Sequence, residues 1–162
     1  MNATGEAKAA DLSREIVLIR DIDAPRDLVF SLWTEPKHLL NWWGPHNCSA
    51  PSVSVDLREG GGWRHCILSP DGKEYWSRGT YLEISPPERL VFTFAWENED
   101  GKPGHKMRVT IELEERGEGT RLVFRKRELP SDTEFKLQSE GWGEALEKVA
   151  VYAEAQAGET SR

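Results

Sequence analysis

The sequence predicts an α+β protein in which a long C-terminal helix covers one face of an antiparallel sheet. Three observations support this prediction. Short runs of alternating apolar and polar residues follow one another in the middle of the chain, turn residues separate these runs, and a long helical pattern follows the last of them. Strands joined by short turns pair antiparallel, and an amphipathic helix that follows them buries its apolar stripe against the sheet.

The first elements are a strand and two short helices. Residues Arg14–Ile22 are dense in β-branched side chains, which is typical of a strand. Ala24-Pro25 then presets the backbone for a helix over Pro25–Trp33, where apolar residues recur at helical spacing. Pro36 ends this helix and begins a second helical piece, Pro36–Trp42.

Six further strands are predicted after these helices. Each shows period-two alternation, and turn signals such as Pro70-Asp71-Gly72-Lys73 separate neighbouring runs. The runs are Val53–Leu57, Trp63–Leu68, Tyr75–Ile84, Leu90–Trp96, Met107–Leu113 and Leu122–Phe124. Their hairpin succession predicts an antiparallel sheet, which the first strand completes.

The last predicted element is a helix over Ser131–Ala155. Ser131-x-x-Glu134 is a capping-box signature, and Phe135, Trp142, Leu146 and Val149 lie on one apolar stripe. Residues 1–11 and 157–162 are polar and aperiodic, so we interpret them as flexible tails. Residues 12–156 then form a single domain.

The net charge and the short apolar runs of the sequence exclude some classes of binding partner. The 162 residues include 21 basic and 28 acidic side chains, which give a formal net charge of −7. Nucleic-acid binding therefore has no electrostatic driving force, and we expect no such partner. The apolar runs are far shorter than the ~20 residues that span a bilayer, and the first residues lack the layout of a signal peptide. We expect a cytoplasmic protein without a membrane partner, either a monomer or a weak homodimer.

No metal or cofactor is expected. The candidate ligands show none of the spacings of known metal sites; they are His38, His46, Cys48, His65, Cys66 and His105. The two cysteines are interpreted as reduced core thiols, because two cysteines do not make a disulfide framework.

Seven tryptophans indicate either a thick core or the wall of an apolar cavity. A four-residue turn over Pro70–Lys73 would oppose His65 to Arg78 and place both on the inner face of the sheet. Arg78, helped by His65, is then the predicted polar anchor for an acidic ligand group. The predicted ligand-binding residues are Trp63, His65, Trp76, Arg78, Phe92, Phe94, Trp96, Val109, Phe124 and Trp142.

Alternatives remain open for these residues. Arg78 can pair with a structural carboxylate such as Glu74 while His65 is a core residue, or His65 can act as a general base. All three interpretations depend on the register of the hairpin around Pro70–Lys73. A slip of one residue would turn the opposed pairs from the inner face to the outer face. The segment Trp42-Trp43-Gly44-Pro45 is either a hydrophobic plug or a cavity lid with a hinge at Gly44-Pro45.

Eight short segments carry a family resemblance. They are Ala24–Phe30, Trp33–Pro36, Leu40–Pro45, Gly61-Gly62-x-Arg64, Gly79-x-Tyr81, Pro87–Phe92, Gly119–Leu122 and Gly141-Trp142. Together they resemble the homologues of the activator of heat shock protein 90 ATPase, within the START-like (SRPBCC) superfamily. The resemblance implies a helix-grip fold, in which a bent sheet of six or seven strands wraps on the C-terminal helix. Gln138 departs from the family, which often has His at this position, and the chain has no room for the separate N-terminal domain of the eukaryotic co-chaperone.

The resemblance also implies a function. We expect a cavity between the sheet and the C-terminal helix that binds a small hydrophobic or amphipathic ligand, without catalysis. One alternative is a co-chaperone-like protein of the stress response that acts on a heat-shock ATPase. Another is an enzyme of the cyclase or dehydratase type that uses the same cavity. Fold alone does not choose among the three.

Overall fold

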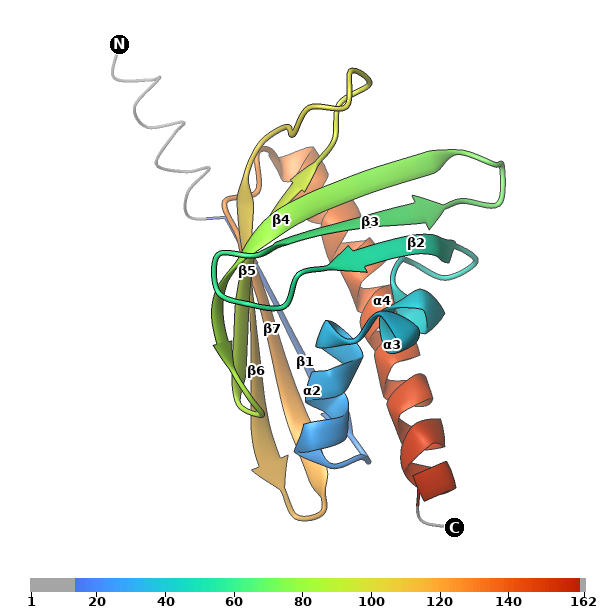
Figure 1. Ribbon diagram of the computed structural model, residues 1–162, viewed down its shortest axis with the longest axis vertical. Coiled ribbons are helices and arrows are strands. Elements are labelled where there is room, and N and C mark those ends of the chain that lie inside the picture. Colours follow the sequence, from blue (N-terminus) through green and yellow to red (C-terminus); the bar gives the residue numbers. More distant parts are fainter. Residues whose placement is uncertain (1–13, 161–162) are drawn as a thin grey trace.

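The computed structural model describes residues 14–160, and it shows a curved sheet wrapped around a long C-terminal helix (Figure 1). Within this range, seven strands pair antiparallel in the order β1-β7-β6-β5-β4-β3-β2. Two short helices follow the first strand, as the sequence predicts. The predicted α+β helix-grip fold is confirmed.

The elements have the following bounds. The strands are β1 (Glu15–Ile22), β2 (Ser49–Val55), β3 (Gly62–Leu68), β4 (Glu74–Ser85), β5 (Arg89–Trp96), β6 (Met107–Arg116) and β7 (Gly119–Arg127). The helices are α2 (Arg26–Thr34), α3 (Pro36–Trp42) and α4 (Asp132–Thr160). Helices α2 and α3 carry the chain from β1 at one edge of the sheet to β2 at the other, and both contact α4.

Helix α4 begins at the predicted cap, where Ser131 Oγ accepts a hydrogen bond from the Glu134 backbone N–H at 3.1 Å. It continues to Thr160, past the predicted end at Ala155. Residues 157–160 are therefore helical and not part of a tail, because strong helix formers such as Ala155 and Ala157 continue the pattern without a proline. The predicted N-terminal tail, 1–11, and residues 161–162 lie outside the described residues.

An aromatic cluster joins α4 to the rest of the fold. The ring centroid of Trp142 lies 4.7 Å from that of Phe124 in β7 and 6.2 Å from that of Trp33 in α2. Further along α4, Leu146 and Val149 are completely buried, as their stripe predicts. Phe135 does not share this burial and is 36% exposed, since it lies in the first turns of α4, which leave apolar side chains uncovered.

The hairpin between β3 and β4 differs from the prediction by one residue. Leu68 pairs with Glu74, and the Ser69 N–H donates to the Lys73 carbonyl at 2.9 Å. The loop therefore contains three residues, Pro70 to Gly72, and not four. Gly72 has φ +86°, the left-handed conformation that completes such three-residue loops.

This shift reverses the two faces of β4. Arg78 pairs with Arg64 and Trp76 pairs with Cys66, whereas inward-facing His65 pairs with Ser77. Trp76 and Arg78 therefore lie on the outer face, and the prediction that they point into the cavity was wrong. Tyr75, Ser77 and Tyr81 take the inner positions, because opposed residues share a face of the sheet.

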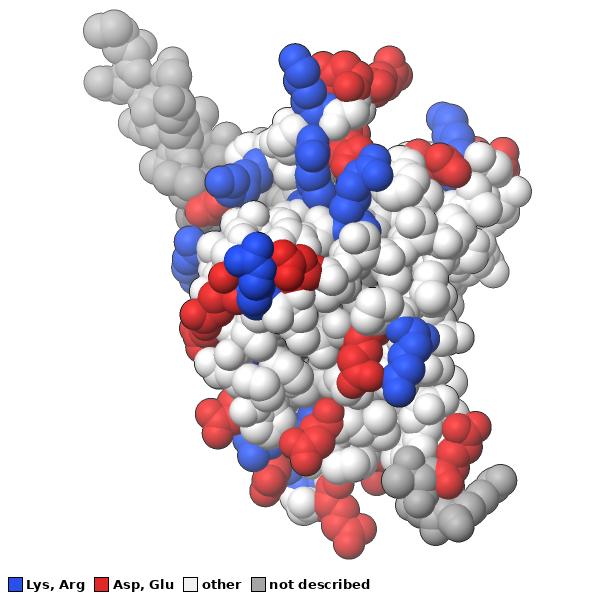
Figure 2. Space-filling model, viewed as in Figure 1, with Lys and Arg blue, Asp and Glu red and all other residues white. Residues whose placement is uncertain are grey.

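The surface carries charges of both signs. Figure 2 shows acidic and basic side chains close to one another on the face drawn. Arg89, for example, bridges Glu83 at 3.1 Å and Glu112 at 2.7 Å across three neighbouring strands. Among the described residues, no helix is long and apolar enough to cross a membrane.

Because Trp142 connects α4 with both β7 and α2, we expect Trp142→Ala to destabilise the protein by about 3–5 kcal/mol, the usual range for truncation of a buried aromatic side chain. Urea unfolding monitored by circular dichroism measures this loss. Leu137→Ala, on the same helix at a 56% exposed position, is the control and should change stability far less. Equal effects of the two substitutions would contradict the packing described here.

Candidate functional site

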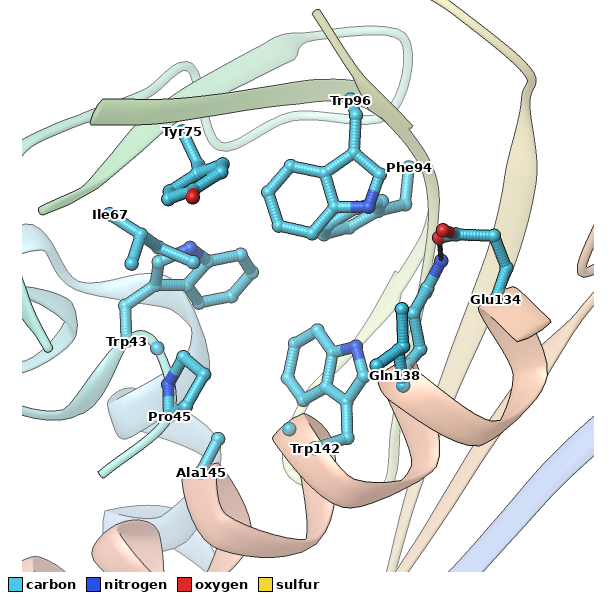
Figure 3. A pocket seen from close by; sticks show the side chains of 13 residues that line it. Trp43, Pro45, Ile67, Tyr75, Phe94, Trp96, Glu134, Gln138, Trp142 and Ala145 are labelled. Carbon is cyan, nitrogen blue, oxygen red and sulfur yellow. Dashed lines mark hydrogen bonds between the residues drawn. The ribbon is translucent and has the colours of Figure 1, made fainter. Parts of the chain in front are cut away.

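A cavity of about 350 Å³ opens between α4, the inner face of β3–β5 and the turn after α3 (Figure 3). The residues that line it are Trp43, Gly44, Pro45, Ile67, Tyr75, Phe94, Trp96, Glu134, Leu137, Gln138, Gly141, Trp142 and Ala145. Figure 3 shows Trp43, Trp96 and Trp142 around one open space. The volume falls within the ~300–1,000 Å³ typical of small-molecule sites.

The cavity meets solvent at an apolar rim. Tyr75 and Leu137 both line it, and they are 45% and 56% exposed. They come from opposite walls, Tyr75 from β4 and Leu137 from α4. An apolar molecule can therefore make its first contacts at the mouth before it enters.

Few polar groups reach the cavity, and two of them lie one turn apart on α4. The Gln138 Nε2 group donates to Glu134 Oε1 at 2.9 Å and lies 3.6 Å from Met107 Sδ. Gln138 Oε1 is buried and accepts no hydrogen bond from any residue in the range 14–160. The Gln138 amide thus offers an unused acceptor beside a carboxylate.

The turn after α3 is held in place as a plug. The Trp43 ring lies 4.7 Å from that of His65 and 5.4 Å from that of Trp142, and the side chain is buried. Lys148 Nζ in α4 donates to the carbonyl oxygens of Gly44, Pro45 and Cys48 at 3.1, 3.2 and 3.4 Å. These bonds fix the segment to α4 and favour the plug over the lid.

Three of the predicted site residues line this cavity, namely Phe94, Trp96 and Trp142. Trp63, His65 and Phe92 lie on the inner face but surround a separate gap of only about 10 Å³. That gap holds at most one water molecule and no organic ligand. Val109 and Phe124 are completely buried in the core and do not line the cavity.

Arg78 lies on the outer face in a network around Glu97. Glu97 accepts hydrogen bonds from Arg64 at 2.6 and 2.9 Å, and Arg78 Nε lies 3.7 Å from the same carboxylate. The hydrogen bond from Arg64 holds the pKa of Glu97 below its ordinary value. Arg78 thus has a structural carboxylate partner, Glu97 rather than Glu74, and it is not an anchor inside the cavity.

His65 is a neutral core residue. It is 2% exposed, and its Nδ1 has no hydrogen-bond partner among the described residues. Burial lowers the pKa of His65 to about 4. The imidazole is therefore uncharged near neutral pH, but it does not line the large cavity where it could act as a base on a ligand.

The sequence reasoning missed Lys126. This β7 side chain is 0% exposed, and its Nζ lies 3.4 Å from the ring centroid of Phe94 and 5.4 Å from that of Trp142. The signal was present, because Lys126 continues the inward alternation of Leu122 and Phe124. The predicted strand ended at Phe124, two residues before Lys126.

Other parts of the surface offer weaker candidates. A more open depression of about 380 Å³ lies beside Asp21, Arg116 and Glu154, and charged side chains form much of its lining. Within residues 14–160, no three His, Cys, Asp or Glu side chains are arranged to hold a metal ion.

Comparisons with known proteins agree with this architecture. A family model described as Activator of Hsp90 ATPase homolog 1-like protein matches residues 23–154. The structure is similar to an AHSA1 protein of Silicibacter pomeroyi, with 26% identity and a TM-score of 0.81 over 88% of this chain and 99% of that chain. A Chromobacterium violaceum protein is 25% identical, with a TM-score of 0.80 over 87% and 98% of the two chains. A Nitrosomonas europaea protein is 27% identical, with a TM-score of 0.75 over 91% and 97%. No curated protein sequence matches the chain.

We expect stability to fall as the pH decreases from about 6.5 to about 4. The unfolded chain protonates His65 near the ordinary value of 6.5, whereas the folded chain resists protonation until about pH 4. The unfolded state therefore binds more protons in this window, which removes about 3 kcal/mol of stability. Burial also lowers the pKa of His38, which acts in the same direction.

Urea unfolding at pH 7 and pH 4.5 tests this expectation. His65→Phe keeps an aromatic ring in the cluster but removes the titration, so its stability should depend less on pH than that of the wild type. His46→Gln, at a half-exposed position, is the control. If His65→Phe and the wild type lose the same stability between the two pH values, the assignment to His65 is wrong.

Proposed function

The chain belongs to the Activator of Hsp90 ATPase homolog 1-like family, and from this premise we propose that it binds a small hydrophobic or amphipathic molecule between the sheet and α4. The START-like fold of this family commonly binds hydrophobic ligands. The binding site that we propose for this chain is the aromatic cavity of about 350 Å³ that opens past Tyr75 and Leu137.

The apolar cavity that the protein's own side chains leave open is the observation that carries the proposal. Protein interiors are close-packed, and voids lined by apolar side chains lower stability. Around this cavity the packing is tight, since Phe94, Trp142 and Ala145 are each at least nine-tenths buried. The cavity stays open although protein interiors tend to close-pack, and its mouth is apolar. Such a space suits an apolar ligand that displaces water from the aromatic walls.

The polar end of the cavity favours a neutral ligand group over an anionic one. Glu134 contributes a carboxylate to the lining, and Arg78, the predicted anchor for an acid, faces away. A ligand carboxylate beside Glu134 would add like-charge repulsion at short range. A flat apolar body with a hydroxyl, amide or carbonyl group matches these walls better.

An interaction with a heat-shock ATPase in the cytoplasm, with a role in the stress response, is a second proposal. Its support is the family description, together with the exposed apolar side chains of Phe135 and Leu137 in the first turns of α4. The cyclase or dehydratase alternative has less support, because His65, its candidate acid or base, lies outside the cavity lining.

Filling the cavity from α4 tests the proposed function. Gly141 lines the cavity, and a Cβ atom there would meet only Pro45 Cγ among nearby atoms, at 3.6 Å. Gly141→Leu should therefore fold and place its side chain in the space that the ligand would occupy. We expect it to bind N-phenyl-1-naphthylamine, a neutral fluorescent apolar probe, at least about tenfold more weakly than the wild type, a change of about 1.4 kcal/mol.

Gly143→Leu is the matched control. Gly143 lies on the same helix, gains the same helix propensity and does not line the cavity, where its Cβ would meet only Arg20 at 3.8 Å. Fluorescence titration of the wild type and both variants compares their affinities. Equal probe affinity in all three proteins would place binding elsewhere and reject the cavity as the site.

A further inference from the structure

Aromatic side chains from separate parts of the chain line the cavity. They are Trp43 in the turn after α3, Tyr75 in β4, Phe94 and Trp96 in β5, and Trp142 in α4. Neighbouring rings stand nearly at right angles, with an interplanar angle of 88° between Trp43 and Trp142 and of 83° between Phe94 and Trp96. Figure 3 shows Trp43, Trp96 and Trp142 on different sides of one open space. Aromatic rings therefore bound the cavity on several sides.

Among the described residues that line the cavity, Glu134 is the only charged side chain. One of its carboxylate oxygens accepts the hydrogen bond from Gln138 Nε2 at 2.9 Å, which orients the carboxylate. Figure 3 shows Glu134 and Gln138 together at one side of the open space. Within residues 14–160, no Lys, Arg or His lies at salt-bridge distance from Glu134. Its negative charge therefore has no ion-pair partner in this range.

We propose that the cavity binds an organic ammonium ion, with aromatic rings around the positive group and the Glu134 carboxylate as its counter-ion. This inference rests on the proposed binding function and assigns the charge of the ligand. The face of an aromatic ring carries negative electrostatic potential, so that Trp, Tyr and Phe attract a cation through cation–π contacts. A carboxylate beside such rings adds a charge–charge attraction, which is stronger in a partly desolvated site than in water.

The carboxylate is what favours a cation over a wholly apolar ligand. An apolar group that fills the space beside Glu134 would remove water from the carboxylate and return no interaction, which costs free energy. A ligand cation replaces the lost water with an opposite charge. An alkylated ammonium group also keeps apolar carbon atoms in contact with the rings, so it uses the aromatic walls as well as the carboxylate.

Two lysines lie near the cavity, but neither lines it. Lys126 Nζ lies 3.4 Å from the ring centroid of Phe94. Burial lowers the pKa of this amine well below its ordinary value, so it is neutral more often than a surface lysine and repels a bound cation less. Lys148 Nζ donates to three backbone carbonyl oxygens, those of Gly44 and Pro45 among them, and their partial negative charges offset its own.

Two probes of the same shape test the charge of the ligand. Phenyltrimethylammonium has a cationic nitrogen where tert-butylbenzene has a neutral carbon. Each is titrated against N-phenyl-1-naphthylamine bound to the full chain, and the loss of fluorescence gives its affinity. Glu134→Gln keeps the size of the side chain and an acceptor for Gln138. We expect it to weaken the cation at least about fivefold and to change the affinity for tert-butylbenzene less than about twofold.

Glu140→Gln is the matched control, because it removes the same charge from an exposed position of α4 that does not line the cavity. It should weaken the cation less than about twofold, since solvent and salt screen a charge at this position. A second pair of variants tests the rings. Trp96→Leu should weaken the cation more than tert-butylbenzene, whereas Trp96→Phe, which keeps a ring face, should retain part of the difference.

The outcomes separate this inference from the proposed function. Selective loss of the cation in Glu134→Gln, but not in Glu140→Gln, supports the inference. Equal changes for the two probes in Glu134→Gln, or equal loss of the cation in both Glu variants, reject it. Failure of phenyltrimethylammonium to displace N-phenyl-1-naphthylamine also rejects it, and the binding function stands as long as N-phenyl-1-naphthylamine itself binds. If none of the three compounds binds the wild type, both proposals are wrong.

Discussion

The position of α4 depends on the burial of Trp142 between Phe124 of the sheet and Trp33 of α2. This one ring packs against both partners and so links the helix to the sheet and to α2. Beyond it, Leu146, Val149 and Ala153 pack without exposed surface. Before it, α4 presents Glu134, Leu137 and Gln138 to an open space. The cavity is the consequence of a helix that packs tightly along one half and only loosely along the other.

The sequence was sufficient for the fold because the signals for its elements are local. Prolines begin or end the short helices, Ser131 caps α4 through its own hydroxyl, and alternation marks the strands over a few residues. The end of α4 was less predictable, because no proline stops it and Ala157, beyond the predicted end, packs against the core. Helix boundaries of this kind depend on contacts that a linear pattern does not contain.

The site was harder to predict because it depends on register between segments. Phe94, Trp96 and Trp142 were predicted correctly. Strand alternation and helical spacing within one element are enough to place a bulky aromatic side chain on the inward face. The assignments of Trp76 and Arg78 failed together, because one loop residue decides the face of every residue in β4. Tyr75 was not predicted as a site residue for the same reason, because the predicted register placed it on the outer face. Leu137 and Gln138 could not be found from the apolar stripe, because a helix residue that lines a cavity beside its buried stripe has no distinctive spacing.

The short β3–β4 loop has a further consequence for how relatives of this protein can differ. Insertion of a single residue after Gly72, with the loop kept at three residues, would exchange the two faces of the following strand without substituting any residue. Tyr75 and Ser77 would leave the interior, and Trp76 and Arg78 would enter it. A neutral chamber would become a cationic one through a change in length alone. Alignment columns in β4 therefore carry the same chemistry between two chains only when β4 has the same register on β3 in both.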